Sequence, residues 1–289
     1  MVLDQAPVHG AGLGLRRAHL GPLSDRIPAA IDFMELAPEN WIGAGGRLGD
    51  ALNRIAENTT FVSHGLLLNL GGPDPLNLEF LRRIKQFLER YGVKYYGDHL
   101  TYCADAGYLY ELLPMPYTDE AARYMAGRIR QVQDVLQRQI TVENASYYCT
   151  PGQEITELDF IQTVLSEADC LMLLDINNIY VNSVNHGYDP VAFLKQLPGE
   201  RIAYAHIAGH SGVAPEIIVD THGTPVIDPV WDLLNTAYEH FGVFPTMLER
   251  DENIPLLDDV LGEIEHIRQI QAQHRGEFGP APRLRQASS

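Results

Sequence analysis

The stretch LMLLDINNIYVN, Leu171 to Asn182, contains the feature that decides the fold. Four large apolar residues precede Asp175, and such an unbroken run is typical of a β-strand buried on both faces. Strands of this kind occur mainly in parallel sheets that are covered by helices. A carboxylate at the end of such a strand is costly to bury unless a cation or a hydrogen-bond donor meets it. The stretch therefore predicts a parallel α/β sheet, and it raises the question of what Asp175 faces.

Eight strand-like runs occur along the chain, with helical patterns between most of them. They are residues 10–16, 30–39, 59–68, 93–100, 139–146, 170–179, 201–210 and 245–251. Eight alternating strands and helices predict an α/β fold of the TIM (β/α)8 barrel type. An open doubly wound sheet is the alternative, because the first crossover, 17–29, is short and weakly helical. The glycines of GAGLGLRR lack a clear following helix, so they are weak support for a dinucleotide site.

Helix signals support this order of elements. In LNLEFLRRIKQFLERYG, apolar residues recur at a spacing of three to four, which lines one face of a helix. Thr118 is a good N-cap for the helix that follows it, and several other helices begin with Asp-Pro or Ile-Pro. We expect a single TIM-barrel domain over residues 1–272 and a flexible C-terminal tail over 273–289.

Composition limits the classes of function. The 289 residues include 21 basic and 38 acidic ones, for a formal net charge of −17. A nucleic-acid partner is therefore not expected, because phosphate recognition depends on clustered Lys and Arg. No apolar run reaches membrane length and no secretory signal is visible, so we expect no membrane partner. Three widely spaced cysteines without a CxxC motif fit a cytoplasmic location.

Metal-competent side chains stand near the same end of six consecutive predicted strands. They are His64, His99, Glu143, Asp175, His206 and Glu249, with Asp220 and His222 in the later loop IVDTHG. In a barrel, the carboxyl ends of the strands build the active site, so these side chains would converge on one axis. Taken singly, each has an ordinary interpretation. A histidine in an apolar strand is usually a satisfied core residue, and Asp175 could simply cap the next turn.

Taken together, these residues predict a metal site. Buried carboxylates do not gather without cations, and imidazole with carboxylate but no thiolate suits Zn, Fe, Mn or Ni. Eight ligands exceed the needs of one catalytic ion and suit two or three, with Glu143 as a bridge. Asp175 would then face a metal, and Asn178 could add an amide oxygen. His210, in HIAGH, is expected beside the ligands rather than among them.

A family resemblance supports this interpretation. The series SHGLLLNLGG, GDHLTY, LLPMPYT, VENASYY, LLDINNIYVN, HIAGH, VDTHG and PTMLERD resembles the UPF0276 (DUF692) family. Its members are called multinuclear non-haem iron-dependent oxidative enzymes, and the resemblance runs from about residue 10 to residue 265. It implies a xylose-isomerase-like TIM barrel, distantly similar to endonuclease IV. Here Asp98 replaces the glutamate that more commonly precedes the ligand His99.

The resemblance also implies ligands, cofactors and partners. One ion would be held by His64, His99 and Glu143. A second would share Glu143 and add Asp175, His206 and Glu249, and a third would use Asn178, Asp220 and His222. The implied cofactors are two or three iron ions, mixed Fe(II)/Fe(III), with dioxygen as co-substrate. Characterised members oxidise cysteines in ribosomally made precursor peptides, by oxazolone and thioamide formation or β-carbon excision, usually with a small peptide-presenting partner protein.

Four further residues are predicted around the site. Asp251, in LERD, and His210 are candidates for proton transfer or for support of the ligands. Asn40 and Trp41, in PENW after the second strand, are expected to help shape a substrate pocket. Two alternatives stay open at this point. One is a metal-dependent hydrolase or isomerase of the endonuclease IV or xylose isomerase type, and the other is a non-catalytic metal-binding protein.

Overall fold

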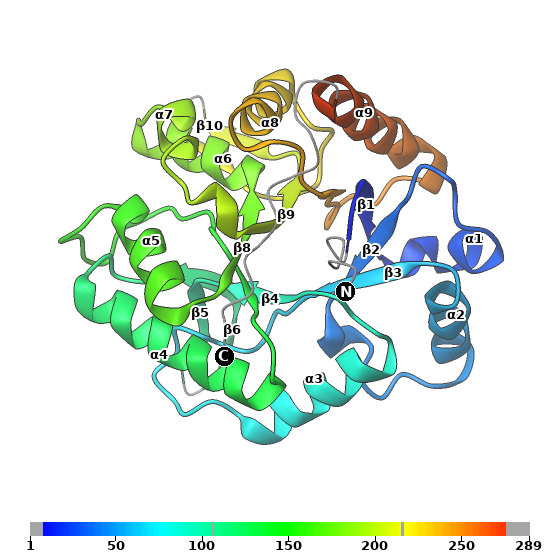
Figure 1. Ribbon diagram of the computed structural model, residues 1–289, viewed down its shortest axis with the longest axis horizontal. Coiled ribbons are helices and arrows are strands. Elements are labelled where there is room, and N and C mark those ends of the chain that lie inside the picture. Colours follow the sequence, from blue (N-terminus) through cyan, green and yellow to red (C-terminus); the bar gives the residue numbers. More distant parts are fainter. Residues whose placement is uncertain (1–7, 106, 215–216, 276–289) are drawn as a thin grey trace, which may run out of the picture.

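Eight parallel strands close into a barrel that is surrounded by helices (Figure 1). The computed structural model describes residues 8–105, 107–214 and 217–275. The barrel strands are β1 (Ala11–Gly14), β2 (Phe33–Leu36), β3 (Thr60–His64), β4 (Tyr96–His99), β7 (Thr141–Glu143), β8 (Leu171–Asp175), β9 (Ile202–Ile207) and β12 (Thr246–Leu248). Each lies within one of the eight predicted runs, and β1 pairs with both β2 and β12 to close the ring. The TIM barrel is therefore confirmed, and the open sheet is wrong.

Helices follow most of the strands and cover the outside of the barrel (Figure 1). They are α1 (Leu20–Asp25), α2 (Gly46–Ala56), α3 (Leu78–Arg90), α4 (Asp119–Leu136), α5 (Glu157–Ala168), α6 (Ile176–His186), α7 (Pro190–Leu194), α8 (Asp228–Phe241) and α9 (Leu257–Arg275), with the short 3-10 turns η1 (Arg17–His19), η2 (Pro38–Asn40) and η3 (Gly199–Arg201). Thr118 caps α4 as predicted, because its hydroxyl accepts a hydrogen bond from the Ala121 amide at 3.1 Å. Residues 273–275, expected in the tail, continue α9, and the rest of that tail, 276–289, lies outside the described residues.

The strand predicted over 170–179 is shorter than expected. β8 stops at Asp175 and α6 begins at Ile176. The reason is local, because the Asp175 carboxylate accepts a hydrogen bond from the Asn178 amide at 2.6 Å and so caps the new helix. The apolar residues Ile176 and Ile179 belong to that helix, since a short apolar run alone does not separate strand from helix.

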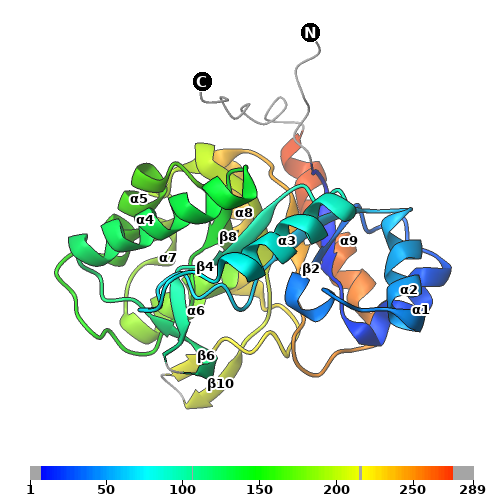
Figure 2. The same cartoon turned by 90° about the horizontal axis from the view of Figure 1, so that it is seen from below.

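Two hairpins that the sequence analysis missed extend the barrel beyond its strand ends. One pairs β5 (Thr101–Ala104) with β6 (Tyr108–Pro114), and the other pairs β10 (Ser211–Ala214) with β11 (Ile217–Val219). β5 follows β4 after one residue and β10 follows β9 closely, so both hairpins project from the carboxyl-terminal side of the barrel, the lower side in Figure 2. They carry exposed apolar side chains, including those of Tyr108 and Ile217.

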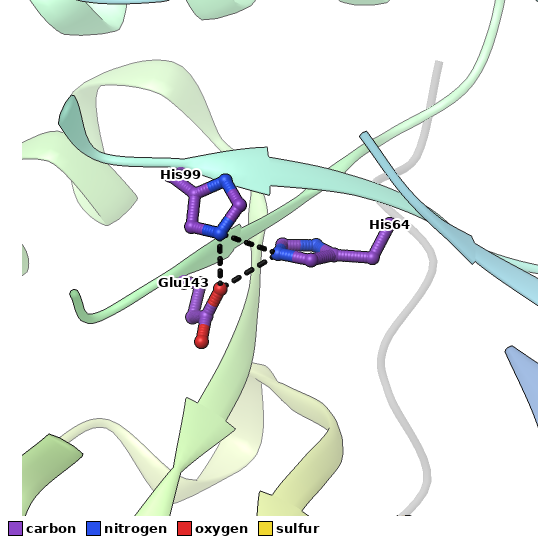
Figure 3. A group of neighbouring side chains, drawn as sticks. All are labelled: His64, His99 and Glu143. Carbon is purple, nitrogen blue, oxygen red and sulfur yellow. Dashed lines mark hydrogen bonds and ion pairs between the residues drawn. The ribbon is translucent and has the colours of Figure 1, made fainter. Parts of the chain in front are cut away.

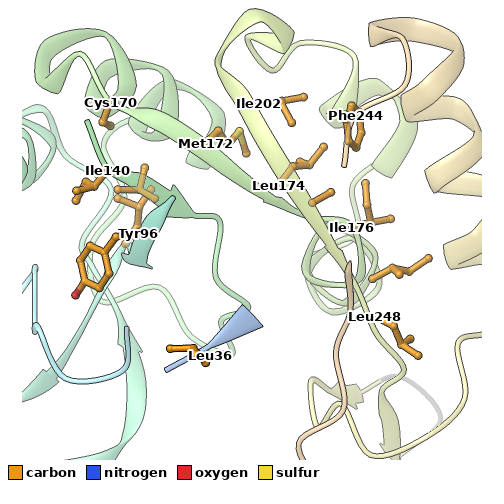
Figure 4. Close-up of a cluster of buried hydrophobic side chains, with 14 of the residues drawn as sticks. Leu36, Tyr96, Ile140, Cys170, Met172, Leu174, Ile176, Ile202, Phe244 and Leu248 are labelled. Atoms are coloured by element: carbon orange, nitrogen blue, oxygen red, sulfur yellow. The ribbon is translucent and has the colours of Figure 1, made fainter. Parts of the chain in front are cut away.

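Alternation along each strand sorts the core into two layers. Side chains such as Leu36, Met172 and Leu174 point outward and pack between the sheet and the helices (Figure 4). The intervening residues point into the barrel. A separate apolar cluster there includes Phe33, Val62, Leu173, Tyr204 and Met247. This inner cluster forms an apolar floor, and the next inward-pointing residues along the strands lie above it.

One buried carboxylate lies away from the strand ends, at the start of α5. Glu157 is hydrogen-bonded by the Tyr147 hydroxyl at 3.2 Å and by the Asn182 amide at 3.2 Å. Burial raises the pKa of Glu157 from 4.5 to about 7, and these two hydrogen bonds oppose that rise only in part. The folded state therefore disfavours the ionised form of this group.

Replacing Glu157 with Gln should change how stability depends on pH. A raised carboxyl pKa means that the folded protein binds more protons than the unfolded chain between about pH 4.5 and 7, so stability falls as pH rises through that window. Gln cannot ionise, so the variant should not lose stability in this way. The free energy of unfolding of Glu157→Gln, relative to that of wild type, should be about 2 kcal/mol higher at pH 8 than at pH 5. Urea unfolding at both pH values measures this. If the stability difference between the variant and wild type were the same at pH 5 and at pH 8, the raised pKa would be contradicted.

Candidate metal centre

The polar layer of the barrel begins two residues after the apolar floor. On β2, β3, β8, β9 and β12 the inward-pointing residue after the floor residue is acidic or a histidine. These pairs are Phe33 and Glu35, Val62 and His64, Leu173 and Asp175, Tyr204 and His206, and Met247 and Glu249. Because the strands are parallel, these side chains all lie toward the carboxyl-terminal mouth, although their register is staggered: Glu35 pairs with Val62, and His206 pairs with Met247.

The first group consists of His64, His99 and Glu143 (Figure 3). Glu143 Oε2 lies 2.7 Å from His64 Nε2 and 3.1 Å from His99 Nε2, and the two imidazole nitrogens are 3.0 Å apart. Strand pairing places His99 directly beside Glu143. On the His64 side, Gly97 leaves the necessary space, since a Cβ there would lie 3.2 Å from His64 Nδ1 and 2.3 Å from Thr141 Oγ1.

His206 lies at the centre of the second group. Its Nδ1 is 2.8 Å from Glu249 Oε2 and 3.8 Å from both Glu143 Oε1 and Asp175 Oδ2. Glu143 thus turns one oxygen toward the pair His64 and His99 and the other toward His206. This is the geometry expected of the bridging carboxylate that the sequence suggested.

A third group adds His222, which can share an ion with Asp175 and Glu249. His222 Nε2 lies 2.6 Å from Asp220 Oδ1, and His222 Nδ1 lies 3.5 Å from Glu249 Oε2. The backbone of His222 is left-handed, with φ of 49°, a conformation that costs a non-glycine residue of order 1 kcal/mol. Such strain is typical of functional sites, where surrounding contacts hold a side chain in one place.

Asp175 both caps a helix and faces the cluster of acids and imidazoles. One oxygen, Oδ1, caps α6 through the Asn178 amide, and the other, Oδ2, faces the cluster without a hydrogen bond. The Asn178 side chain donates to Glu143 Oε1 at 3.3 Å and to the Asn144 carbonyl at 3.1 Å. Its own Oδ1 is buried and unpaired, so this oxygen remains able to bind a cation.

The electrostatics of the cluster show strong coupling between acids and imidazoles. Burial and the neighbouring carboxylates of Glu143 and Asp220 raise the pKa of Asp175 well above its usual range. Burial opposes the charged form of His99, but Glu143 and Asp98 outweigh it and raise the pKa of His99 to about 10. The pKa of Glu143 is lowered despite its burial, because His64 and His99 are close. Without a further cation, protons therefore provide the positive charge that balances the carboxylates.

The donor set fits metal ions. Glu143 Oε2, Asp175 Oδ2, Asn178 Oδ1, His206 Nδ1 and His222 Nε2 are buried and form no hydrogen bond within the described residues. Several of these atoms lie within 4 Å of a partner of opposite polarity, as given above, without forming a hydrogen bond to it. Atoms arranged in this way are expected where cations sit between them. Oxygen and imidazole nitrogen donors suit iron, manganese and zinc.

Two residues at the site were missed by the sequence analysis. Glu35, on β2, accepts hydrogen bonds from the Tyr204 hydroxyl at 2.7 Å and from His206 Nε2 at 2.9 Å. Arg16 follows β1 and forms ion pairs with Glu249 and Asp251. Both carried a signal, since Glu35 interrupts the apolar run FMEL and Arg16 is the last residue of the predicted strand run 10–16. With them, all eight barrel strands contribute a side chain to the mouth.

The remaining predicted residues lie farther from the cluster. His210 Nδ1 is 2.8 Å from Asn177 Oδ1, and Asn177 in turn donates to Asp220 at 2.7 Å. Asp251 is exposed, and its Oδ2 lies 3.0 Å from His222 Nδ1. Asn40 is exposed, and Trp41 is buried in the outer apolar layer. No hydrogen bond or ion pair joins Asn40 or Trp41 to the cluster in the described part of the chain.

Comparison with solved structures identifies the class of fold. A xylose isomerase domain protein from Alicyclobacillus acidocaldarius matches with a TM-score of 0.60 at 18% identity, covering 92% of this chain and 100% of that chain. Endonuclease IV from Thermus thermophilus matches with a TM-score of 0.59 at 14% identity, covering 91% and 99%. The chain is therefore a xylose-isomerase-like TIM barrel, as the sequence resemblance implied.

Comparison of sequences identifies the family. Residues 10–272 match the family model of the RiPP precursor modification enzymes MbnB/TglH/ChrH. The abbreviation RiPP stands for ribosomally synthesised and post-translationally modified peptide. The chain belongs to this family. A UPF0276 protein of Shewanella amazonensis is 51% identical over 262 residues, which covers 91% of this chain and 94% of that protein. One of Alcanivorax borkumensis is 53% identical over 273 residues, covering 91% of each.

Metal should stabilise the fold through Glu143. Ferrous iron, added without oxygen at 100 times its Kd, should raise the free energy of unfolding by about 2.7 kcal/mol. Glu143→Gln should lose most of this gain because it removes the shared carboxylate, whereas a change at the exposed rim, Glu154→Gln, should keep it. Thermal unfolding with ferrous iron or with a chelator checks this. Equal metal-induced shifts in the two variants would argue against a bridge at Glu143.

Proposed function

We propose that this protein oxidises a cysteine of a ribosomally made precursor peptide, using iron and dioxygen. Two facts support the proposal. The chain belongs to a family of precursor-modifying enzymes. Its barrel mouth also gathers imidazole and carboxylate donors without a cysteine ligand, which leaves the soft thiolate position to a substrate.

Named residues would hold the metal. His64, His99 and Glu143 form one position, and a second shares Glu143 and adds Asp175, His206 and Glu249. A weaker third position would use Asn178, Asp220 and His222. Two or three bound iron ions, mixed Fe(II)/Fe(III), would supply the one-electron steps and the binding of thiolate and dioxygen. The apolar floor beneath the ligands would keep water from approaching from below.

His210 is suited to hold the proton that the substrate thiol releases. Asn177 donates through its amide nitrogen to Asp220, so its oxygen accepts from His210 Nδ1. The hydrogen of His210 is therefore on Nδ1, and its other nitrogen can accept a proton. Burial lowers the pKa of His210, which keeps the ring neutral near pH 7. Asp251 would help to orient His222 from the opposite side.

The surroundings of the mouth suit a peptide and its presenting protein. The β5–β6 and β10–β11 hairpins stand on this side of the barrel (Figure 2). They expose apolar side chains, including those of Tyr108 and Ile217. A small partner protein that presents the peptide would dock here, and Asn40 would contribute to the adjoining surface, whereas the buried Trp41 would act only through packing. No described helix is both long and apolar enough to cross a membrane. The cysteines Cys103, Cys149 and Cys170 are free, and we place the protein in the cytoplasm.

Iron and a cysteine peptide should both be needed for dioxygen use. Protein purified without oxygen should contain more than one iron per chain, because the cluster offers donors for at least two ions. Dioxygen uptake should require a short Cys-bearing peptide encoded beside this gene, and a Cys→Ser version should give none. Metal analysis and an oxygen electrode measure this. A protein that binds only zinc and uses no dioxygen with any such peptide would refute the proposal.

The same preparation tests the two alternatives. Cleavage of abasic DNA or isomerisation of aldoses by the metal-loaded protein would favour the hydrolase or isomerase type. Solved structures of that type are similar in fold alone, at 18% identity or less in the matches above. A protein that only stores metal would bind iron but show no turnover at all.

Replacing His210 should separate proton transfer from metal binding. His210→Gln should lower kcat by about 100-fold, the usual contribution of a general base, without loss of iron. Wild-type activity should fall as pH drops below the lowered pKa of His210, and the variant should lose this acidic limb. His99→Ala should lose iron and activity together. The exposed His240→Gln is the matched control, and iron loss in His210→Gln would place His210 among the ligands instead.

A further inference from the structure

Glu35 is a buried carboxylate whose partners connect it to one ligand of the metal centre. It is 3% exposed and points into the barrel from β2, directly above the floor residue Phe33. A single oxygen, Oε2, accepts two hydrogen bonds, from the Tyr204 hydroxyl at 2.7 Å and from His206 Nε2 at 2.9 Å. Tyr204 is itself held, since its ring stacks on Tyr95 and meets the edge of Phe33.

The two nitrogens of His206 face different partners. Nδ1 faces the cluster, with Glu249 Oε2 at 2.8 Å and Asp175 Oδ2 at 3.8 Å, whereas Nε2 faces Glu35. An imidazole that binds a cation through Nδ1 must carry its hydrogen on Nε2. A carboxylate at Nε2 favours this arrangement and makes Nδ1 a stronger donor.

We propose that Glu35 is a positioning residue that fixes His206 with Nδ1 toward the metal and raises the ligand strength of that nitrogen. The inference rests on the proposed function only in requiring that the cluster binds metal. Glu35, His206 and Glu249 also lie close enough together to hold an ion. Because Glu35 Oε2 already accepts from the Tyr204 hydroxyl and from His206 Nε2, we assign Glu35 to positioning rather than to binding. It also lies at the opposite nitrogen of the ring from Glu249.

Loss of this contact should weaken metal binding in graded steps. Glu35→Gln can still accept the hydrogen bond through its amide oxygen but has no charge, so affinity should fall about 10-fold. Glu35→Ala removes the acceptor, and affinity should fall about 100-fold. Tyr204→Phe leaves the bond between Glu35 and His206 intact and should have the smallest effect.

The experiment is a zinc titration of the metal-free protein in competition with a chelator of known affinity. Glu157→Gln is the matched control, since Glu157 is also a buried carboxylate bonded to a tyrosine and an amide but touches no ligand. This control should bind zinc as wild type does. Circular dichroism confirms that each variant is folded, and Glu35→Gln remains informative if Glu35→Ala does not fold.

Nitrogen NMR of the zinc-loaded protein, with labelled histidine, provides a readout that a merely structural role would not move. In wild type, His206 should coordinate through Nδ1 and show a protected Nε2–H signal, which Glu35→Gln should shift. Coordination through Nε2, or wild-type affinity in both Glu35 variants, would overturn the inference. So would the loss of one whole zinc equivalent at saturation in Glu35→Gln, because that would make Glu35 a ligand. A wild-type protein that binds no metal would instead remove the proposed function, and this inference with it.

Discussion

The structure depends on the crowding of acids and imidazoles near one end of a closed barrel. Each strand alternates, so a residue that points inward is followed two positions later by another. Here apolar inward residues form a floor, and the next ones along five strands are Glu35, His64, Asp175, His206 and Glu249. Carboxylates buried this closely repel one another unless positive charge lies between them. The need for positive charge, from metal ions or from protonated imidazoles, therefore follows from the strand pattern itself.

Much of the fold could be predicted because the barrel strands are apolar on both faces. All eight predicted runs contain a barrel strand, and the convergence of the polar strand ends follows from parallel register alone. The end of β8 was placed four residues too late, because LLDINNI is apolar enough to suit either a strand or a helix. Only the side chain of Asp175, by capping α6, decides between them. The two hairpins were missed since they are short and two-stranded, and they are stabilised by the barrel on which they stand.

The sequence analysis named residues for the site but could not indicate how their atoms are arranged. The ordinary and the metal-binding interpretations of Asp175 are compatible, because its two oxygens have different partners. Glu35 and Arg16 were missed for a shared reason. Their importance lies in contacts with His206 and Glu249, which are distant in sequence, and no local spacing reports such a contact.

Closure of the barrel between β1 and β12 has a consequence for how the protein is made. The donors are spread from His64 to Glu249, and the ring is complete only when the last strand pairs with the first. A nascent chain that emerges from the ribosome in order cannot assemble the full cluster until nearly all of it has been synthesised. Metal loading of this cluster would therefore be a late, post-translational event, and an incomplete chain would present only part of the site.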